Sequence, residues 1–398
     1  MNAPASNSLP PARSRRRKSI LLRIALVGAA TLVLLEVVFQ LVLPPFEYVS
    51  FTQSDDYLFV RFIPGKEGEF KLRRPSILNS GSVLSSYRVR INRQGLRAER
   101  DYHIPKPAGV YRVLCLGDSI TFGWGLPLSE TWPELLETAL SARLMGRRVE
   151  VINAGYPGYT TRQGLIWLDR ELVRLEPDAV VVEFGFNDSL PSWFRTRGPI
   201  RLENDQTLMA GDPGHWVPIR RLPLEPLAYH LSETFTAKFA LIIYSMLKNQ
   251  NPTYAANETK GGKESTRSYE WARVPPADYR ENLILIASRC RKAGARPVLV
   301  SAWGTPEAYR AVMPEVAMVS GATVVYQSEI IMQALAHPAE VAADPRFQTT
   351  IARLKKEPNP FPPGIYCLVL VDYLHPNFIG NTLFVDRLAE VLAPSPRP

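Results

Sequence analysis

The sequence is poor in cysteine: its 398 residues include only three, Cys115, Cys290 and Cys367. Their odd number and wide spacing exclude a C-x-x-C metal or redox motif and supply no disulfide framework. We expect the three thiols to be small buried hydrophobic groups, so cysteine usage leaves the cellular compartment open.

Motifs for several other chemistries are missing. The sequence has no G-x-S-x-G elbow, which argues against the α/β-hydrolase type of serine nucleophile. It has neither a phosphate-binding loop nor G-x-G-x-x-G, so a nucleotide cofactor finds no support. Four of the five histidines have no second ligand at metal spacing: His103, His215, His230 and His337. We therefore expect neither a cofactor nor a metal.

Acidic residues are missing from the N-terminal end, where the first one is Glu36. Six basic residues precede it: Arg13, Arg15, Arg16, Arg17, Lys18 and Arg23. Without these six the net charge falls from +9 to +3. The basic character therefore belongs to one end of the chain, and we expect no nucleic-acid partner.

The basic cluster borders an apolar run at 20–43, which is long enough to span a bilayer at ~1.5 Å per residue. Because positively charged flanks stay cytoplasmic, we predict a single-pass signal anchor, a cytoplasmic tail at 1–19 and an extracytoplasmic body, periplasmic or at the cell surface. A cleaved signal peptide and an amphipathic buried helix are the alternatives. Glu36 weakens the span, but Pro44 and Pro45 end it at a membrane exit, and no small-x-small cleavage site follows.

The composition of the rest is that of a globular protein, with 46% hydrophobic and 21% charged residues. Its 35 prolines indicate long irregular connections. Apolar and polar residues alternate at 57–63 and 87–91, the pattern of half-buried strands. We predict a small β-rich pre-domain at 46–108 and a main domain at 109–396.

From residue 110 onward, short apolar strands alternate with helix-length segments. Predicted strands are 110–116, 149–152, 179–183, 297–302 and 322–326, and predicted helices are 131–143, 164–174, 278–293 and 379–392. This alternation predicts the α/β class, a parallel sheet with helices on both faces. Ligands of such sheets bind at the carboxyl ends of the strands.

An insertion interrupts this alternation at about 190–276, a length that indicates a functional or partly disordered segment. An apolar, aromatic-rich helix is expected at 227–247, as plain core or as a lid, and a polar mobile stretch at 249–268. Asn257 begins a formal glycosylation sequon, meaningful only in a suitable secretory pathway.

Four small clusters fall directly after predicted strands, where an α/β sheet places its active site. They are Gly117-Asp118-Ser119, Asn153-Ala154-Gly155, Gly185-Phe186-Asn187-Asp188 and Asp372-Tyr373-Leu374-His375. Each cluster alone is typical of a turn, a helix cap or a solvated side chain. Their order and common placement make the combination specific.

In these clusters the chain resembles the SGNH (GDSL-like) serine hydrolases. The preceding stretch 91–97 also looks like one found before the first block in membrane-anchored bacterial members. The family's four blocks supply Ser, Gly, Asn and His, which match Ser119, Gly155, Asn187 and His375, with Asp372 at the usual offset before the histidine. The resemblance covers about 110–392 outside the insertion. It implies a three-layer α/β/α flavodoxin-like sandwich.

The chemistry of the matched residues supports the same assignment. A serine hydroxyl needs a base within hydrogen-bond reach, and the base needs a third group that fixes its tautomer. His375 and Asp372 suit these roles for Ser119. The Ser119 N–H, the Gly155 N–H and the Asn187 amide are candidate oxyanion donors. We expect glycine at 155 because a Cβ there would obstruct the approach of the substrate.

The two aspartates beside the matched residues have simpler interpretations. For Asp118 and Asp188, structural hydrogen bonding or helix capping is favoured over a chemical step.

The resemblance implies an extracytoplasmic esterase that hydrolyses carboxylic esters through an acyl-serine. O-acetyl groups on polysaccharide and lipid esters are candidate substrates. One alternative uses the same triad to transfer the acyl group to a glycan hydroxyl, and another is a catalytically silent surface domain that binds glycan or a partner protein. The motif does not determine the acyl chain of the substrate, the alcohol to which it is esterified, or the group that accepts the acyl chain.

Overall fold

The computed structural model describes residues 51–73, 83–190, 196–197, 201–202, 204–219, 269, 272–356, 368–372 and 374–393, and seven positions between 23 and 34. Those seven positions are helical and are the described residues of one compact unit, made of 1–46, 75–81 and 221–263. All other described elements belong to a second unit, made of 47–74, 82–220 and 264–398.

Several sequence-based predictions fall on segments outside the described residues. These are most of the span at 20–43, the helix at 227–247, the polar stretch at 249–268, and Cys367. Within the described part of the chain, no helix is both long and apolar enough to cross a bilayer.

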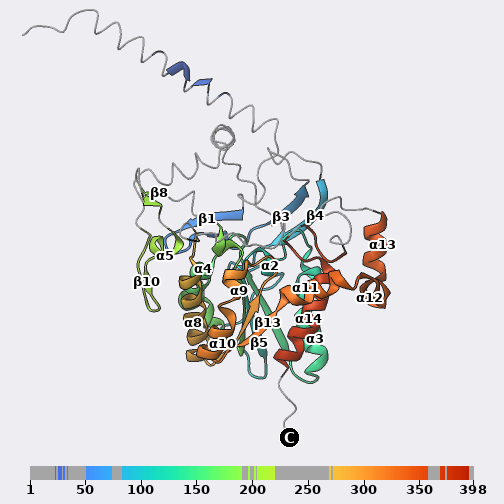
Figure 1. The fold of residues 1–398 in the computed structure, drawn as a ribbon. Helices are drawn as coiled ribbons and strands as arrows, with labels where there is room; N and C mark the ends of the chain where they lie inside the picture. The colour runs from blue at the N-terminus through green and yellow to red at the C-terminus, as the bar shows by residue number, and fades with distance from the viewer. Residues whose placement is uncertain are drawn as a thin grey trace, which may run out of the picture. The chain divides into compact units, whose positions relative to one another are not determined.

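The second unit is built on a five-stranded sheet (Figure 1). Its strands are β5 (Tyr111–Gly117), β6 (Val149–Gly155), β7 (Ala179–Phe184), β12 (Arg296–Ser301) and β13 (Thr323–Tyr326). They are all parallel and lie in the order β13-β12-β7-β5-β6. Numbered along the chain this is the flavodoxin-like order 2-1-3-4-5, which places the ligand crevice beyond the carboxyl ends of β5 and β7. The predicted parallel α/β sheet is confirmed.

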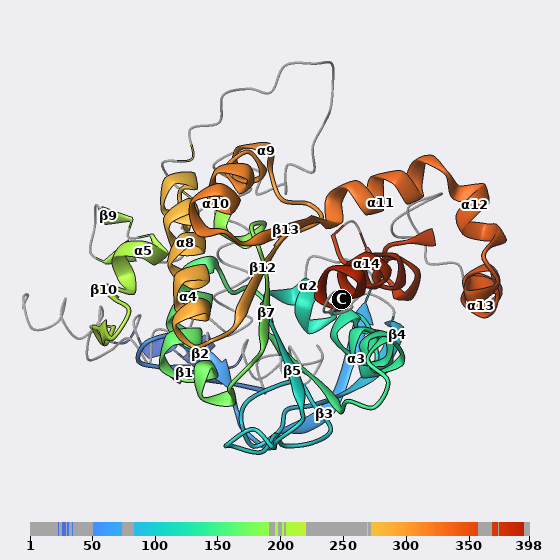
Figure 2. The ribbon, with the colours of Figure 1, turned by 90° about the horizontal axis from the view of Figure 1, so that it is seen from below.

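Helices cover both faces of the sheet (Figure 2). On one face lie α4 (Thr161–Arg170), α8 (Pro276–Lys292) and α10 (Met313–Ser320). On the other lie α3 (Trp132–Arg143), α11 (Gln327–Ala336) and α14 (Phe378–Leu392). The result is the three-layer sandwich that the resemblance implied.

The side chains of β5 explain why both faces are covered. All seven residues of β5 are buried. Val113 and Cys115 pack with Trp132 of α3, while Leu114 and Leu116 join the hydrophobic cluster on the opposite face. Neighbouring positions in a strand point to opposite faces, so an uninterrupted apolar strand needs a helix layer on each side. The prediction that Cys115 and Cys290 are buried is also confirmed.

One predicted helix differs from the structure. The segment expected at 164–174 begins earlier, at Thr161, because Thr160 and Gln163 form a capping box. It ends at Arg170, and a separate 3₁₀ helix, η3 (Leu172–Leu175), follows.

The segment before the sheet contains two antiparallel hairpins. β1 (Thr52–Asp55) pairs with β2 (Phe59–Phe62), and β3 (Glu67–Arg73) pairs with β4 (Val83–Arg90). Buried side chains of these strands, such as Phe62 and Val89, belong to the same hydrophobic cluster as Leu114 of the sheet. The segment is therefore β-rich and shares a hydrophobic cluster with the sheet, and a domain boundary at 108 stays a prediction.

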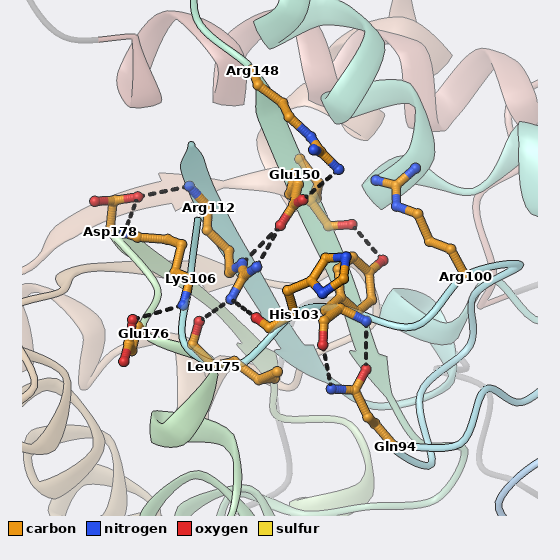
Figure 3. Close-up of polar contacts among 12 residues, drawn as sticks. Gln94, Arg100, His103, Lys106, Arg112, Arg148, Glu150, Leu175, Glu176 and Asp178 are labelled. Atoms are coloured by element: carbon orange, nitrogen blue, oxygen red, sulfur yellow. Dashed lines mark hydrogen bonds and ion pairs between the residues drawn. The ribbon is translucent and has the colours of Figure 1, made fainter. Parts of the chain in front are cut away.

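Figure 3 shows a polar network at the amino-terminal edge of the sheet. The Arg112 side chain, fully buried, donates to the Glu150 carboxylate at 2.6 and 2.9 Å. It also donates to the carbonyls of His103 (3.1 Å) and Leu175 (2.6 Å), and Arg148 lies 3.0 Å from Glu150. Arg112 of β5 thus forms hydrogen bonds with Glu150 of β6 and with the segments that contain His103 and Leu175.

Short elements complete the unit. They are α2 (Ser119–Phe122), η2 (Leu128–Glu130), η4 (Asn187–Ser189), β8 (Thr196–Arg197), β9 (Arg201–Leu202), α5 (Asp205–Leu208), β10 (Gly211–Asp212), β11 (His215–Trp216), α9 (Glu307–Arg310), α12 (Pro338–Ala343), η6 (Pro345–Phe347) and α13 (Gln348–Lys356). Those from β8 to β11 belong to the insertion, whose two ends meet where Val274 N–H donates to the Asp188 carbonyl.

Candidate active site

Three of the four sequence clusters meet at the carboxyl edge of the sheet. β5 lies between β6 and β7, and Gly117 is in register with both Gly155 and Glu183. Ser119 begins α2 immediately after β5, and Asn187 begins η4 after β7. The sheet therefore brings Ser119, Gly155 and Asn187 to one place, as predicted.

Within the described residues 368–371 that precede it, the fourth cluster follows no strand of the sheet, contrary to the sequence-based prediction. Leu370 and Pro376 form an isolated bridge, and Asp372 and His375 lie in the loop that it closes. The apolar residues before the loop are buried, as strand residues would be, but they pack in a cluster with Ile331 and Ile379. Asn377 then caps α14 by accepting from Ile379 N–H at 2.8 Å.

The nucleophile candidate lies at the first position of a short helix. Asp118 caps α2 by accepting from Ile120 N–H at 2.9 Å. Gly117 allows the tight passage from β5 into α2, because a Cβ there would lie 2.0 Å from Thr121 Oγ1 and 2.7 Å from the Glu183 carbonyl. As the first residue of α2, Ser119 has an N–H outside the helical hydrogen-bond ladder.

The predicted Ser-His-Asp constellation is assembled. His375 Nε2 lies 2.8 Å from Ser119 Oγ, and His375 Nδ1 lies 2.8 Å from Asp372 Oδ2. The other Asp372 oxygen accepts from the N–H groups of Leu374 (2.8 Å) and His375 (2.7 Å). One carboxylate thus shapes the loop with one oxygen and orients the imidazole with the other.

The charge states suit proton transfer. Burial would raise the pKa of Asp372, but the His375 charge and the hydrogen bonds outweigh it and the pKa is lowered. Burial would lower the pKa of His375, but the charge and hydrogen bond of Asp372 outweigh it and the pKa is raised above 6.5. Asp372 therefore stays ionised, and His375 is a stronger base than a free imidazole.

The candidate oxyanion donors differ in what they already bind. Asn187 Nδ2 donates to Asp118 Oδ2 at 2.9 Å, which orients the amide and uses one of its two hydrogens. The Gly155 N–H donates to Asn153 Oδ1 at 3.0 Å, so it must be shared with an incoming oxyanion.

Glycine at 155 has a different cause from the one expected. A Cβ at Gly155 would lie 2.1 Å from Phe122 N and 2.6 Å from Thr121 C, so it would collide with the backbone of α2. The close packing of β6 against the nucleophile helix thus requires the glycine.

Asp118 and Asp188 have the structural roles that the sequence favoured. Besides capping α2, Asp118 accepts from Asn187. Asp188 accepts from the N–H (2.9 Å) and the hydroxyl of Thr161. Burial raises the pKa of Asp118 to about 6 and that of Asp188 to about 7.

Arg97, which sequence reasoning assigned no role, supports the nucleophile helix from the pre-sheet segment. Its buried guanidinium donates to the carbonyls of Phe122 (2.5 Å), Gly123 (2.8 Å) and Leu126 (2.6 Å). Burial lowers the pKa of Arg97 to about 10. Its place at the end of the stretch 91–97, which also resembles the family, was the available signal.

Comparison with known proteins bears on this site. Residues 115–221 match the GDSL-like Lipase/Acylhydrolase family, a stretch that contains Ser119, Gly155 and Asn187. The chain is 42% identical over 79 residues to an arylesterase of Vibrio mimicus, covering 20% of this chain and 38% of that protein. It is 34% identical over 107 residues to Esterase TesA of Pseudomonas aeruginosa, covering 27% and 50%.

The chain thus spans half or less of the length of these curated relatives. Among solved structures, a crystal structure of TesA aligns with a TM-score of 0.38 at 18% identity, covering 71% of this chain and 98% of that one. The sequence matches support the prediction of a GDSL-like (SGNH) hydrolase family enzyme.

Proposed function

We propose that this protein is a serine esterase that hydrolyses carboxylic esters through an acyl-serine intermediate. The observation that carries the proposal is the continuous chain from Ser119 Oγ through His375 to Asp372, with both links at 2.8 Å. A serine hydroxyl held against a raised-pKa imidazole is the arrangement that activates a weak nucleophile.

Acylation follows from this geometry. His375 Nε2 accepts the Ser119 proton while Oγ attacks the ester carbonyl carbon, and Asp372 holds the imidazolium that forms. The Ser119 N–H and the second Asn187 amide hydrogen lie at the same strand ends and donate to the oxyanion. The imidazolium then protonates the departing alkoxide, which leaves the acyl group on Ser119.

Deacylation repeats the steps with water. His375 takes a proton from water, the hydroxide attacks the acyl-serine, and the proton returns to Ser119 Oγ as the acid departs. If a sugar hydroxyl replaced water, the same residues would transfer the acyl group instead.

The proposal also includes a cellular location and a substrate class. The basic cluster before the apolar run at 20–43 supports a membrane anchor with the catalytic unit outside the cytoplasm. In that location the accessible esters are O-acetylated polysaccharide and lipid esters.

The test uses the full chain in detergent with p-nitrophenyl esters of increasing acyl length. We expect hydrolysis by the wild type, and loss of it in both Ser119→Ala and His375→Ala, with a preferred acyl length that narrows the substrate class. Equal hydrolysis by wild type and both variants would refute the proposal. A parallel assay with an acetylated glycan and a free-hydroxyl acceptor separates hydrolysis from transfer.

A further inference from the structure

A buried carboxyl group lies directly beneath the nucleophile helix and takes no part in the mechanism above. Glu183, near the carboxyl end of β7, is 0% exposed and is in register with Gly117. The adjacent positions of β7 hold Val182 and Phe184, so an apolar residue would suit the strand itself. Burial raises the pKa of Glu183 to about 8, which shows the cost of a charge here.

Three neutral donors, each from a different helix, satisfy this carboxyl group. Its Oε2 accepts from the Thr121 hydroxyl of α2 at 2.6 Å and from the Trp132 indole of α3 at 2.8 Å. Its Oε1 accepts from the Gln327 amide of α11 at 2.8 Å. No cation of the described ranges forms an ion pair with Glu183, so the three hydrogen bonds that hold this carboxyl group come from neutral donors.

Two of the three partners lead to the reacting groups. Thr121 lies two residues after Ser119 in the four-residue helix α2. The oxygen of Gln327 accepts from Trp303 N–H at 2.8 Å, in the loop after β12. The next residue, Gly304, packs so closely on Leu374 that a Cβ would lie 2.5 Å from its side chain, and Leu374 adjoins the base His375.

We propose that Glu183 is a positioning residue, which through Thr121 and Gln327 fixes the nucleophile helix relative to the loop that packs against the base. This inference rests on the proposed function and adds a residue to it. Glu183 does not touch the reacting atoms. It sets the distance between Ser119 Oγ and His375 Nε2, and a small misplacement of catalytic groups can cost ~10²-fold in rate.

The hydrogen-bond polarity makes the proposal testable with a single-atom change. In Glu183→Gln one acceptor becomes an NH₂ group that faces the NH₂ of Gln327. If Gln327 rotates to accept, its NH₂ then opposes Trp303 N–H. If the new amide instead turns its NH₂ toward Thr121, that NH₂ opposes the Trp132 indole N–H. Each arrangement leaves two donors opposed. In the double variant Glu183→Gln/Gln327→Glu, the carboxylate introduced at position 327 accepts from both the amide introduced at position 183 and Trp303 N–H, and all bonds return.

The experiment measures kcat, KM and the rate of fluorophosphonate labelling of the full chain, each normalised to folded protein. We expect Glu183→Gln to lower kcat and labelling by about 10–100-fold with little change in KM. The double variant should recover most of the loss. Thr121→Val, which cuts only the link to α2, should lower both rates by a smaller factor.

Trp132→Phe is the matched control, because it removes the donor that leads only to α3. It should lower the melting temperature and keep kcat per folded molecule. If Glu183→Gln keeps full kcat, or if the folded double variant recovers nothing, the positioning role is wrong. If Thr121→Val and Trp132→Phe reduce kcat equally, Glu183 is only a stabilising group. Absence of labelling in the wild type would instead refute the proposed function.

Discussion

The buried carboxyl groups at the two edges of the central sheet have different kinds of partner. At the amino edge, the buried carboxylate of Glu150 meets two arginines, Arg112 and Arg148. At the carboxyl edge, Asp118 and Glu183 are held by backbone and side-chain donors that carry no charge. Burial there raises the pKa values of the two carboxyl groups to about 6 and about 8.

The difference indicates which edge serves stability and which serves chemistry. A buried carboxylate that is paired with arginine has its charge compensated. A buried carboxyl group that accepts from neutral donors instead holds those donors in fixed directions. Acyl transfer needs hydrogen-bond donors in fixed directions and a base of suitable pKa. Substitutions at the two edges should therefore separate activity from stability.

The largest effect on activity short of removing the nucleophile is expected from Asp372→Asn. The Asn oxygen can still accept from Leu374 N–H and His375 N–H, so the loop keeps its shape. Its NH₂ group would face His375 Nδ1 and favour the wrong tautomer. We expect kcat to fall by ~10⁴, measured with a p-nitrophenyl ester, while the circular dichroism spectrum stays unchanged. A loss below tenfold would contradict the role of Asp372.

At the amino edge, Arg112→Met should have the reverse effect. It leaves Glu150 without its buried partner and removes the bonds to the His103 and Leu175 carbonyls. We expect the free energy of unfolding to fall by about 3–5 kcal/mol, with kcat per folded molecule unchanged. Urea unfolding and active-site titration measure the two quantities. A kcat that falls in a fully folded sample would break the proposed division between the edges.

Asn187→Ala tests the oxyanion donors at the carboxyl edge. The variant removes the amide that Asp118 orients and should lower kcat by ~10²–10³ with a small change in KM. Asp118→Asn is the companion variant: it keeps the cap of α2 and loses the acceptor for Asn187 if its NH₂ takes that place. Its kcat should lie between those of wild type and Asn187→Ala. Full activity of Asn187→Ala would remove this residue from the site.

The smallest effect is a shift in the pH profile. His375 must be neutral to accept the serine proton, and its pKa is raised. Activity is therefore full above this pKa and falls as the pH drops through it, so the acid limb of kcat/KM should lie above pH 6.5. The pKa of Asp118 is about 6, and its charge helps to raise the pKa of His375, so Asp118→Asn should move the limb slightly to lower pH. A limb that vanished in that variant would assign it to Asp118.

The sheet and three parts of the site could be predicted from the sequence alone because they depend on local patterns. Continuous apolar strands that end in Gly117, Gly155 and Phe184 place the following polar residues at one edge. Asp372 and His375 were assigned through the family resemblance and an expected preceding strand, where the described residues before the loop form only the isolated bridge of Leu370. Their position depends on how an irregular loop packs, which no period of two or 3.6 residues encodes.

The hydrogen bonds of Glu183 with Thr121, Trp132 and Gln327 could not be predicted from the sequence, because they also depend on tertiary packing. Thr121 and Gln327 lie 62 and 144 residues from Glu183, and only the folded sheet brings their helices together. The one signal was an acidic residue at the end of the apolar run Ala179–Phe184. The reason for Gly155 was likewise visible only in the contact with α2.

The most direct test of the central claim is fluorophosphonate labelling of the full-length protein, with the adduct located by mass spectrometry in wild type, Ser119→Ala and His375→Ala. We predict a single adduct on Ser119, absent in Ser119→Ala and strongly slowed in His375→Ala, because the imidazole activates the hydroxyl at 2.8 Å. An adduct on another residue, or none on the folded wild type, would contradict the assignment of Ser119 as the nucleophile.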